Sequence, residues 1–257
     1  MTYGRTTRYT NQALGNAVGI DKVSWPRTAD EMADRVGVAP SAMWRLNGAF
    51  PISPDAGDQS LAVTVGTFAT GQQTPYASEL CTTHTTTSTQ AATTSSSTLL
   101  DNPGSSLNIA WAMRGYFPEP PAVDNRWMIS RFDGSVPQYG YVLKRYGTTF
   151  NFGITDTTNS ISDSVSVTAP SETWGTLLCG YSIDELFIYV VFVDDDGKIY
   201  AGSKALSSSW TGKNMRSGGY FKTTLQSPSY LYSIVGLAGF IHAIGTEEDA
   251  VKFATGI

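Results

Sequence analysis

Nine short segments with alternating or continuous apolar residues recur between residues 107 and 244, and this periodicity most constrains the fold. The breaks between them carry Asp-Gly, Pro-rich or Asn/Ser/Gly-rich sequences, which favour tight turns. Only residues 246–254 predict a helix, which would begin with a capping box. The pattern therefore predicts a mainly β architecture, an antiparallel two-sheet jelly-roll sandwich. The predicted strands are 107–113, 126–132, 139–145, 148–154, 163–169, 174–181, 186–193, 198–206 and 232–244.

This C-terminal part resembles concanavalin A-like (LamG-type) sandwiches. The segment Ser130-Arg131-Phe132-Asp133-Gly134 and the following Gly140-Tyr141-Val142-Leu143 match a family pattern, as do Trp174, Gly180 and Tyr181 further on. The family's closing motif is represented at 237–243 without its acid pair. The resemblance implies the sandwich fold and specifies no activity. Residues 186–193 are apolar throughout, which predicts a strand buried on both faces.

Residues 20–66 carry a second pattern. Thr28 and Glu31 form a capping box, so we expect a helix that begins at Ala29 and ends at Gly37. A second helix is predicted after Pro40 and Ser41; it would bury Ala42, Met43 and Leu46 and end at Asn47-Gly48. Residues 60–65 alternate as a strand that can pair with 22–25. The predicted order is β-α-α-β.

This order resembles a LysM domain. The family's motifs are matched at Met32–Val38, Met43–Asn47 and Gly57–Leu61, whereas its Gly-Asp-Thr entry is replaced by Trp25-Pro26-Arg27-Thr28. LysM domains bind N-acetylglucosamine polymers through two loops. The resemblance implies a binding site for a glycan or a protein partner, and the alternative is an adaptor with Trp25 and Phe50 in an interface or core. The candidate contact residues are Trp25, Arg27, Thr28, Phe50, Pro51 and Ile52.

Charge and composition divide the chain. Residues 1–48 hold six basic and four acidic side chains, whereas the remainder of the chain holds eleven basic and eighteen acidic side chains. Thirteen of the seventeen residues after Cys81 are Ser or Thr, a composition typical of linkers. We therefore expect an extended N-terminal arm (1–19), a LysM-like module (20–68), a Ser/Thr-rich linker (69–103) and the sandwich (104–257).

The overall composition excludes several classes of partner. A net charge of −5 and a pI near 5.0 argue against nucleic-acid binding, which needs clustered Lys and Arg. The longest apolar run has eight residues against the roughly 20 of a membrane span, and the first twenty residues lack a signal core. Cys81 and Cys179 form no disulfide framework, so we expect both to be reduced and inert.

Catalytic and metal-binding motifs are missing from the sequence. Retaining glycosidases of this fold place two carboxylates on one strand, but Glu172, Asp184 and Glu185 are isolated. The cluster Asp194-Asp195-Asp196-Gly197 offers calcium ligands, although a solvated hairpin turn is favoured. His84 and His242 have no third zinc ligand near them. The sequence thus predicts no enzymatic activity, no metal and no cofactor.

Four aromatic residues before the last predicted strand are candidates for binding. Sugars stack on aromatic rings, so they would form a concave glycan platform on the sandwich; alternatively they anchor a protein interface, where Tyr and Trp are enriched. These residues are Trp210, Tyr220, Tyr230 and Tyr232.

These features favour a bacteriophage virion protein without catalytic function, for capsid decoration or as part of the tail or baseplate. The N-terminal part would dock on the particle and the sandwich would face outward, with other virion proteins and copies of the chain as partners. The predicted location is the virion, assembled in the host cytoplasm and released by lysis. A carbohydrate-binding protein that recognises peptidoglycan or host surface glycans is the alternative, and a divergent glycoside hydrolase is the second alternative.

Overall fold

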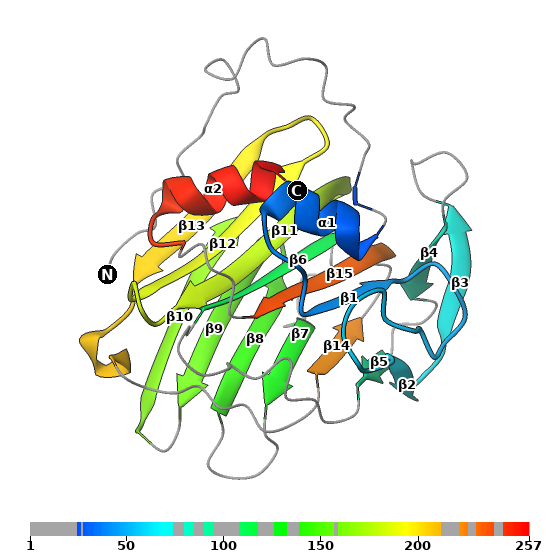
Figure 1. Ribbon diagram of the computed structural model, residues 1–257, viewed down its shortest axis with the longest axis horizontal. Helices are drawn as coiled ribbons and strands as arrows, with labels where there is room; N and C mark the ends of the chain where they lie inside the picture. Colours follow the sequence, from blue (N-terminus) through cyan, green and yellow to red (C-terminus); the bar gives the residue numbers. More distant parts are fainter. Residues whose placement is uncertain are drawn as a thin grey trace.

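Two antiparallel sheets pack face to face (Figure 1). The computed structural model describes residues 25–26, 28–73, 80–84, 90–94, 108–117, 126–132, 139–156, 159–211, 221–225, 230–238 and 244–256. In spatial order, the larger sheet contains β13 (Ile199–Ala205), β12 (Phe187–Asp194), β11 (Thr173–Ser182), β6 (Asn108–Phe117), β15 (Tyr230–Ala238), β4 (Leu80–His84) and β3 (Phe68–Gln73), with β1 (Ala42–Arg45) also paired to β15. The smaller sheet contains β10 (Ile161–Thr168), β9 (Thr149–Asp156), β8 (Tyr139–Tyr146), β7 (Arg126–Phe132), β14 (Phe221–Leu225), β5 (Gln90–Thr93) and β2 (Ala62–Val65). The predicted mainly β sandwich is confirmed.

The main core lies between the two sheets. Alternate residues of each strand point inward, as the two-residue period of a strand requires. Three phenylalanines form its aromatic centre: the ring of Phe192 lies 5.5 Å from that of Phe117 and 5.6 Å from that of Phe150. The remaining inward positions of β12 are Ile188 and Val190, both fully buried. Burial of β12 on both faces confirms the prediction for residues 186–193.

A second core lies on the outer face of the larger sheet, under two helices. Figure 1 shows α1 (Ala29–Val36) and α2 (Glu247–Gly256) lying across this sheet. The helices bury Met32, Val36, Ala250, Val251 and Ala254 in the same cluster as Phe187, Tyr189 and Val191 of β12. Neither helix is long and apolar enough to cross a bilayer in the part of the chain that the structure describes.

Both helix starts follow the predicted capping chemistry. The Thr28 hydroxyl accepts a hydrogen bond from the Glu31 backbone N–H at 3.1 Å, and Gly37 ends the helix with a left-handed φ of 75°. At the other end of the chain, the Thr246 hydroxyl accepts from the Asp249 backbone N–H, also at 3.1 Å. The helices predicted at 29–36 and 246–254 are confirmed.

The second helix of the predicted β-α-α-β order is wrong, because residues 42–45 form the strand β1. Ala42, Met43 and Trp44 pair in register with Gly236, Val235 and Ile234 of β15. Ala42 and Trp44 face the main core and Met43 faces the second core. A strand buried on both faces is apolar throughout, and such a short run does not distinguish a strand from a buried helix.

The predicted linker over residues 69–103 is also wrong where the structure describes it. This range contains most of β3 together with β4 and β5, which pair with strands of the two sheets. Thr is β-branched and suits a strand, and pairing satisfies the backbone of a polar segment as well as water does. Because β1 and β2 belong to the same sheets as β6 and β7, the boundaries predicted at 68 and 103 do not separate the sheets. The arm predicted at 1–19 lies outside the described residues.

Candidate functional site

The candidate residues before α1 are used by the fold. Trp25 is buried in the second core, under the helices. Thr28 is the N-cap of α1, so its hydroxyl is occupied by the backbone. Arg27 lies outside the described residues. Trp25 therefore has the core position that was the alternative to sugar binding, and its side chain is not accessible to a ligand.

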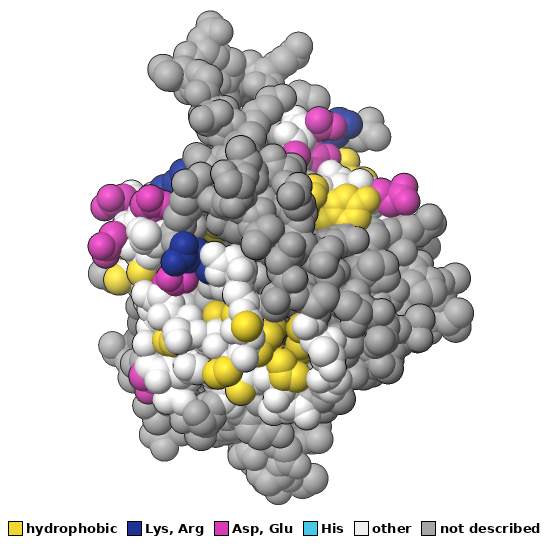
Figure 2. Space-filling model, turned by 90° about the vertical axis from the view of Figure 1, so that its right-hand side faces the viewer, with side chains coloured by type: hydrophobic (Ala, Val, Ile, Leu, Met, Phe, Trp, Pro, Cys, Tyr) yellow, Lys and Arg dark blue, Asp and Glu magenta, His cyan; other side chains and the backbone are white. Residues whose placement is uncertain are grey.

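The candidate residues before β2 are mostly packed as well. Phe50 stacks on Phe68 with 4.8 Å between ring centroids, and Ile52 is buried and forms an isolated bridge with Leu61. Pro51 is exposed. Figure 2 shows hydrophobic side chains gathered among uncharged ones on the side of the molecule where β2 and β3 lie. Of the three residues, only Pro51 is freely available to a ligand.

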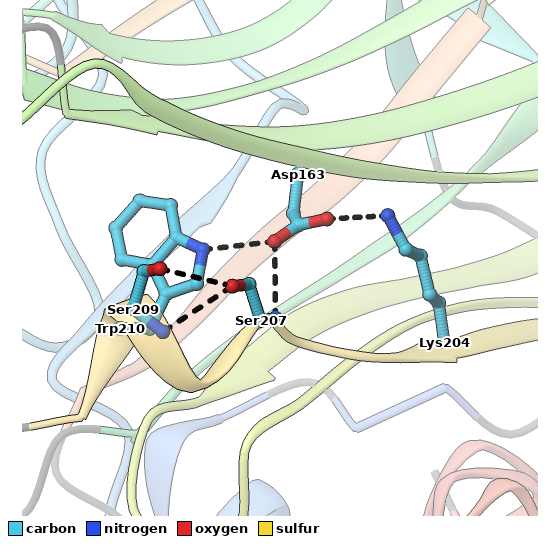
Figure 3. Close-up of polar contacts among 5 residues, drawn as sticks. All are labelled: Asp163, Lys204, Ser207, Ser209 and Trp210. Atoms are coloured by element: carbon cyan, nitrogen blue, oxygen red, sulfur yellow. Dashed lines mark hydrogen bonds and ion pairs between the residues drawn. The ribbon is translucent and has the colours of Figure 1, made fainter.

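Trp210 is not a platform for a sugar, because its side chain is fully buried at 0% exposure. It lies in a short 3-10 helix, η2 (Ser208–Trp210), that follows β13. Its indole Nε1 donates a hydrogen bond of 2.9 Å to the Asp163 carboxylate on β10 (Figure 3). A buried Trp needs such a partner, and this one fixes the ring inside the sandwich.

Asp163 is the centre of a polar knot, which we define as Asp163, Lys204, Ser207, Ser209 and Trp210 (Figure 3). The carboxylate also accepts hydrogen bonds from the Ser207 backbone N–H at 3.3 Å and from the Lys204 ammonium. The Ser207 hydroxyl in turn accepts from the Ser209 backbone N–H at 3.2 Å. The knot ties the edge strand β10 of the smaller sheet to the segment after β13, the edge strand of the larger sheet. It therefore closes one edge of the sandwich.

The knot makes stability depend on pH in the acid range. Burial alone raises the pKa of Asp163, but hydrogen bonds from Lys204, Trp210 and Ser207 and the Lys204 charge outweigh it, so the pKa is lowered. A carboxylate with a lowered pKa stabilises the fold above its unfolded pKa of about 3.9, and this contribution is lost as the pH falls through the folded pKa.

We expect the Asp163→Asn variant to lose less stability than the native chain between pH 6 and pH 2.5, because the variant has no carboxylate to protonate at this position. Urea denaturation at both pH values measures the difference. An equal loss in both proteins would contradict the stabilising role of the Asp163 charge.

The tyrosines of the predicted platform are placed only in part. Tyr220 lies outside the described residues. Tyr230 and Tyr232 belong to β15, with Tyr230 opposite Tyr116 of β6 and Tyr232 at a register shift between Leu231 and Ser233. The backbone therefore puts Tyr230 beside Tyr116, although sequence reasoning grouped it with Trp210.

The acidic cluster after β12 forms a hairpin turn, as predicted. The Gly197 N–H donates to the Asp194 carbonyl at 2.8 Å, and Gly197 has a φ of 75°. The Asp194 side chain accepts from the Lys198 backbone N–H at 2.8 Å. Within the described ranges, no three His, Cys, Asp or Glu residues are grouped to hold a metal ion. His84 lies in β4, and His242 falls outside these ranges.

The remaining reactive side chains are placed apart. Asp184 and Glu185 lie in the turn between β11 and β12, and Glu172 is exposed just before β11 with a left-handed φ of 59°. Cys179 is fully buried in the main core, and burial raises the pKa of its thiol well above the ordinary value. Such a thiol is a poor nucleophile.

A site that sequence reasoning missed lies at one end of the larger sheet. Tyr116 of β6 and Trp174 of β11 are direct register partners, and their ring centroids are 6.0 Å apart at an interplanar angle of 55°. Both residues are half-buried, and Trp174 packs against the second core. We call this pair the aromatic corner. Its two rings meet at an angle and form a shallow corner instead of a flat floor.

Charged groups adjoin the aromatic corner. Arg114 lies two residues before Tyr116 on β6 and faces outward as Tyr116 does. It forms an ion pair with Asp195 of the hairpin turn. The Asp195 backbone N–H donates to the Trp174 carbonyl at 3.1 Å, which holds the turn against β11. The Arg114 side chain is 7% exposed and that of Asp195 is 34% exposed. The Asp195 carboxylate is therefore partly accessible to solvent, in a turn that is bonded to the backbone of Trp174.

The aromatic corner was predictable only in part. Trp174 was noted as a family marker, and the strand predicted at 107–113 ended before Tyr116, whereas β6 continues to Phe117. The available signal is the alternation of β6, in which Trp111 and Met113 face the main core and the even-numbered positions face outward. The pairing of β6 with β11 is a long-range contact that no local pattern shows.

No family model matches the sequence, and no curated protein matches it. Solved structures do resemble it. A structure of botulinum neurotoxin type C matches with a TM-score of 0.58 and 8% identity over 88% of this chain and 53% of that chain. The binding domain of botulinum neurotoxin DC matches with a TM-score of 0.55 and 8% identity over 84% of this chain and 52% of that chain. The binding domain of Paraclostridial Mosquitocidal Protein 1 matches with a TM-score of 0.55 and 9% identity over 83% of this chain and 52% of that chain.

The likeness is one of fold. It shows the concanavalin A-like jelly-roll sandwich that these toxin binding domains contain. This chain spans about half the length of the chains that it matches. The type C structure is described as showing cell entry that depends on interaction with two ganglioside molecules, and the DC domain is in complex with SialylT.

Proposed function

We propose that this chain is a non-catalytic binding protein that recognises glycans through the aromatic corner. The observation that carries the proposal is the half-buried pair of Tyr116 and Trp174 beside the partly exposed Asp195 carboxylate. A pyranose ring has an apolar C–H face that suits the negative face of an aromatic ring. Its hydroxyl groups suit acceptors placed at the rim of such a ring.

The comparison of folds gives further support to glycan recognition, and the placement of two acidic residues supports a role without catalysis. Among the toxin structures with the same fold, the type C structure is described by a cell entry that depends on interaction with two ganglioside molecules, and the DC binding domain is in complex with SialylT. The acidic residues Asp184 and Glu185 occupy a tight turn, where the Glu185 N–H donates to the Ser182 hydroxyl at 3.0 Å. That arrangement serves the turn and does not resemble the two facing carboxylates of a glycosidase.

The virion role predicted from the sequence stays a prediction. It includes docking through the N-terminal part, contacts with other virion proteins and with copies of the chain, and release by lysis. Glycan recognition is compatible with it, because a particle that attaches to a cell needs an outward-facing binding module. The glycan function is the one that we propose, since the aromatic corner supports it directly.

We expect the Trp174→Ala variant to lose at least about 10-fold in affinity for any glycan that the native chain binds, which corresponds to about 1.4 kcal/mol. Removal of the larger ring takes away the stacking surface while the opposite edge of the sheet stays intact. A glycan array identifies the ligand, and titration calorimetry on the full chain measures the affinity.

The matched control is Tyr146→Ala. Tyr146 is an aromatic residue with 56% exposure at the end of β8 in the smaller sheet. This variant should bind as the native chain does. Thermal unfolding of both variants separates a loss of binding from a loss of folding. Equal binding by Trp174→Ala and the native chain, with both folded, would overturn the assignment of the site.

A further inference from the structure

Resting on the proposed glycan function, we infer that the aromatic corner selects neutral glycans over sialylated or otherwise anionic ones. The selection follows from the charges that adjoin the rings. Glu172, two residues before Trp174, is exposed, and so is Asp196 in the hairpin turn. The Glu172 backbone N–H donates to the Phe117 carbonyl at 2.7 Å, next to Tyr116, and Asp196 follows Asp195 in the turn that is bonded to the Trp174 carbonyl. With the partly exposed Asp195, three carboxylates therefore lie on segments that are hydrogen-bonded to the strand ends that carry the aromatic pair.

Of the cations that the structure describes on these segments or in contact with them, Arg114 and Arg145 are buried and Lys198 is exposed, so the exposed carboxylates outnumber the exposed cations. The Arg145 Nη2 donates to the Phe117 carbonyl at 3.4 Å. Arg114 is almost wholly buried and already forms an ion pair with Asp195, so its positive charge is largely neutralised within the protein. Lys198 is exposed at the end of the hairpin turn, and its backbone N–H donates to the Asp194 carboxylate at 2.8 Å. An anionic sugar at the rings would therefore meet a net negative potential. Like charges a few ångströms apart disfavour binding even near the surface.

A neutral sugar meets the opposite situation. Each hydroxyl group is a hydrogen-bond donor, and an ionised carboxylate is the strongest acceptor that a side chain provides. Asp195 is held in place by its ion pair with Arg114 and by its backbone bond to the Trp174 carbonyl. It is therefore a fixed acceptor beside the rings, and little conformational freedom is lost when a hydroxyl binds to it.

The geometry of the rings adds a constraint on the shape of the ligand. Because the two rings meet at 55°, one pyranose can lie on the Trp174 ring while its edge or the next residue contacts Tyr116. A bent glycosidic linkage fits such a corner better than a flat, extended chain. The structure thus assigns a neutral, hydroxyl-rich oligosaccharide to this site.

The test compares matched pairs of ligands that differ by one charged sugar. Lactose is paired with 3′-sialyllactose, and lacto-N-tetraose with its sialylated form, by calorimetry on the full chain at low and at physiological salt. We expect the neutral member of each pair to bind at least about 10-fold tighter, with a smaller difference at high salt because screening weakens the repulsion.

The Asp195→Asn variant should reduce the difference in affinity between the neutral and the sialylated ligand, since it removes a negative charge but keeps the shape of the side chain. The matched control is Glu248→Gln, which removes a charge on the exposed face of α2, where Glu248 pairs with Lys252. That change should leave the ratio unaltered.

The outcomes separate the inference from the function on which it rests. Tighter or equal binding of the sialylated members, lost in Trp174→Ala, would overturn the inference and leave the glycan function standing. Neutral binding that neither Trp174→Ala nor Asp195→Asn alters would overturn the site. Binding of no member of a wide glycan array would overturn the proposed function, and the inference with it.

Discussion

The Phe192→Ala variant should unfold with a free energy about 3–5 kcal/mol below that of the native chain. Phe192 is fully buried on β12, an interior strand of the larger sheet, and its ring contacts those of Phe117 and Phe150 in the main core. Alanine removes the buried ring and leaves a cavity between two sheets that cannot collapse, because each sheet is held by its own ladder of hydrogen bonds.

Urea denaturation followed by tryptophan fluorescence measures this loss. The Tyr146→Ala variant is the control, since a 56% exposed side chain away from the core should change stability by less than about 0.5 kcal/mol. A loss below 1 kcal/mol in Phe192→Ala would mean that the three phenylalanines do not form the centre of the sandwich.

Strand positions in the second half of the chain were predictable because local patterns decide them. The strand predicted at 126–132 coincides with β7, and that at 186–193 is displaced by one residue from β12. Turn residues such as the Asp194–Gly197 cluster set the ends of these strands. The same holds for α1, whose cap and stop residues lie within its own sequence.

The first half was predictable only in part because tertiary pairing decides it. Residues 42–45 are compatible with a helix or a strand, and the free edge of β15 determines which one forms. The short segments of β4 and β5 have no alternating apolar pattern of their own, so their strand structure depends on neighbours far along the sequence. Secondary-structure propensity and hydrophobic period describe a segment by itself and do not show which strand edge it pairs with.

The candidate site was missed for the same reason. Proximity in sequence grouped Trp210 with three tyrosines, but the chain folds Trp210 inward onto Asp163. The aromatic pair that does face outward comes from β6 and β11, whose pairing joins residues 58 positions apart, Tyr116 and Trp174. Sequence neighbours on a strand alternate between the faces of a sheet, so a cluster in sequence is a poor guide to a cluster on a surface.

Trp210 provides the second large prediction. The Trp210→Ala variant should lose about 3–5 kcal/mol in the free energy of unfolding, because it removes a fully buried indole at the edge where the two sheets meet. Trp210→Phe keeps most of the apolar volume but removes the Nε1–H that Asp163 accepts. It should lose about 1–3 kcal/mol, the cost of a buried acceptor that loses one partner.

Combining Trp210→Phe with Asp163→Asn tests the knot itself. If the two side chains act as one unit, the double variant should be less destabilised than the sum of the two single variants, because the second change removes a partner that is already unmatched. Glycan affinity measured per folded molecule should be unchanged in Trp210→Phe. A sugar platform at Trp210 would give the reverse result, a large loss of glycan affinity with little change in stability. The buried position of Trp210 instead predicts a loss of stability with unchanged glycan affinity.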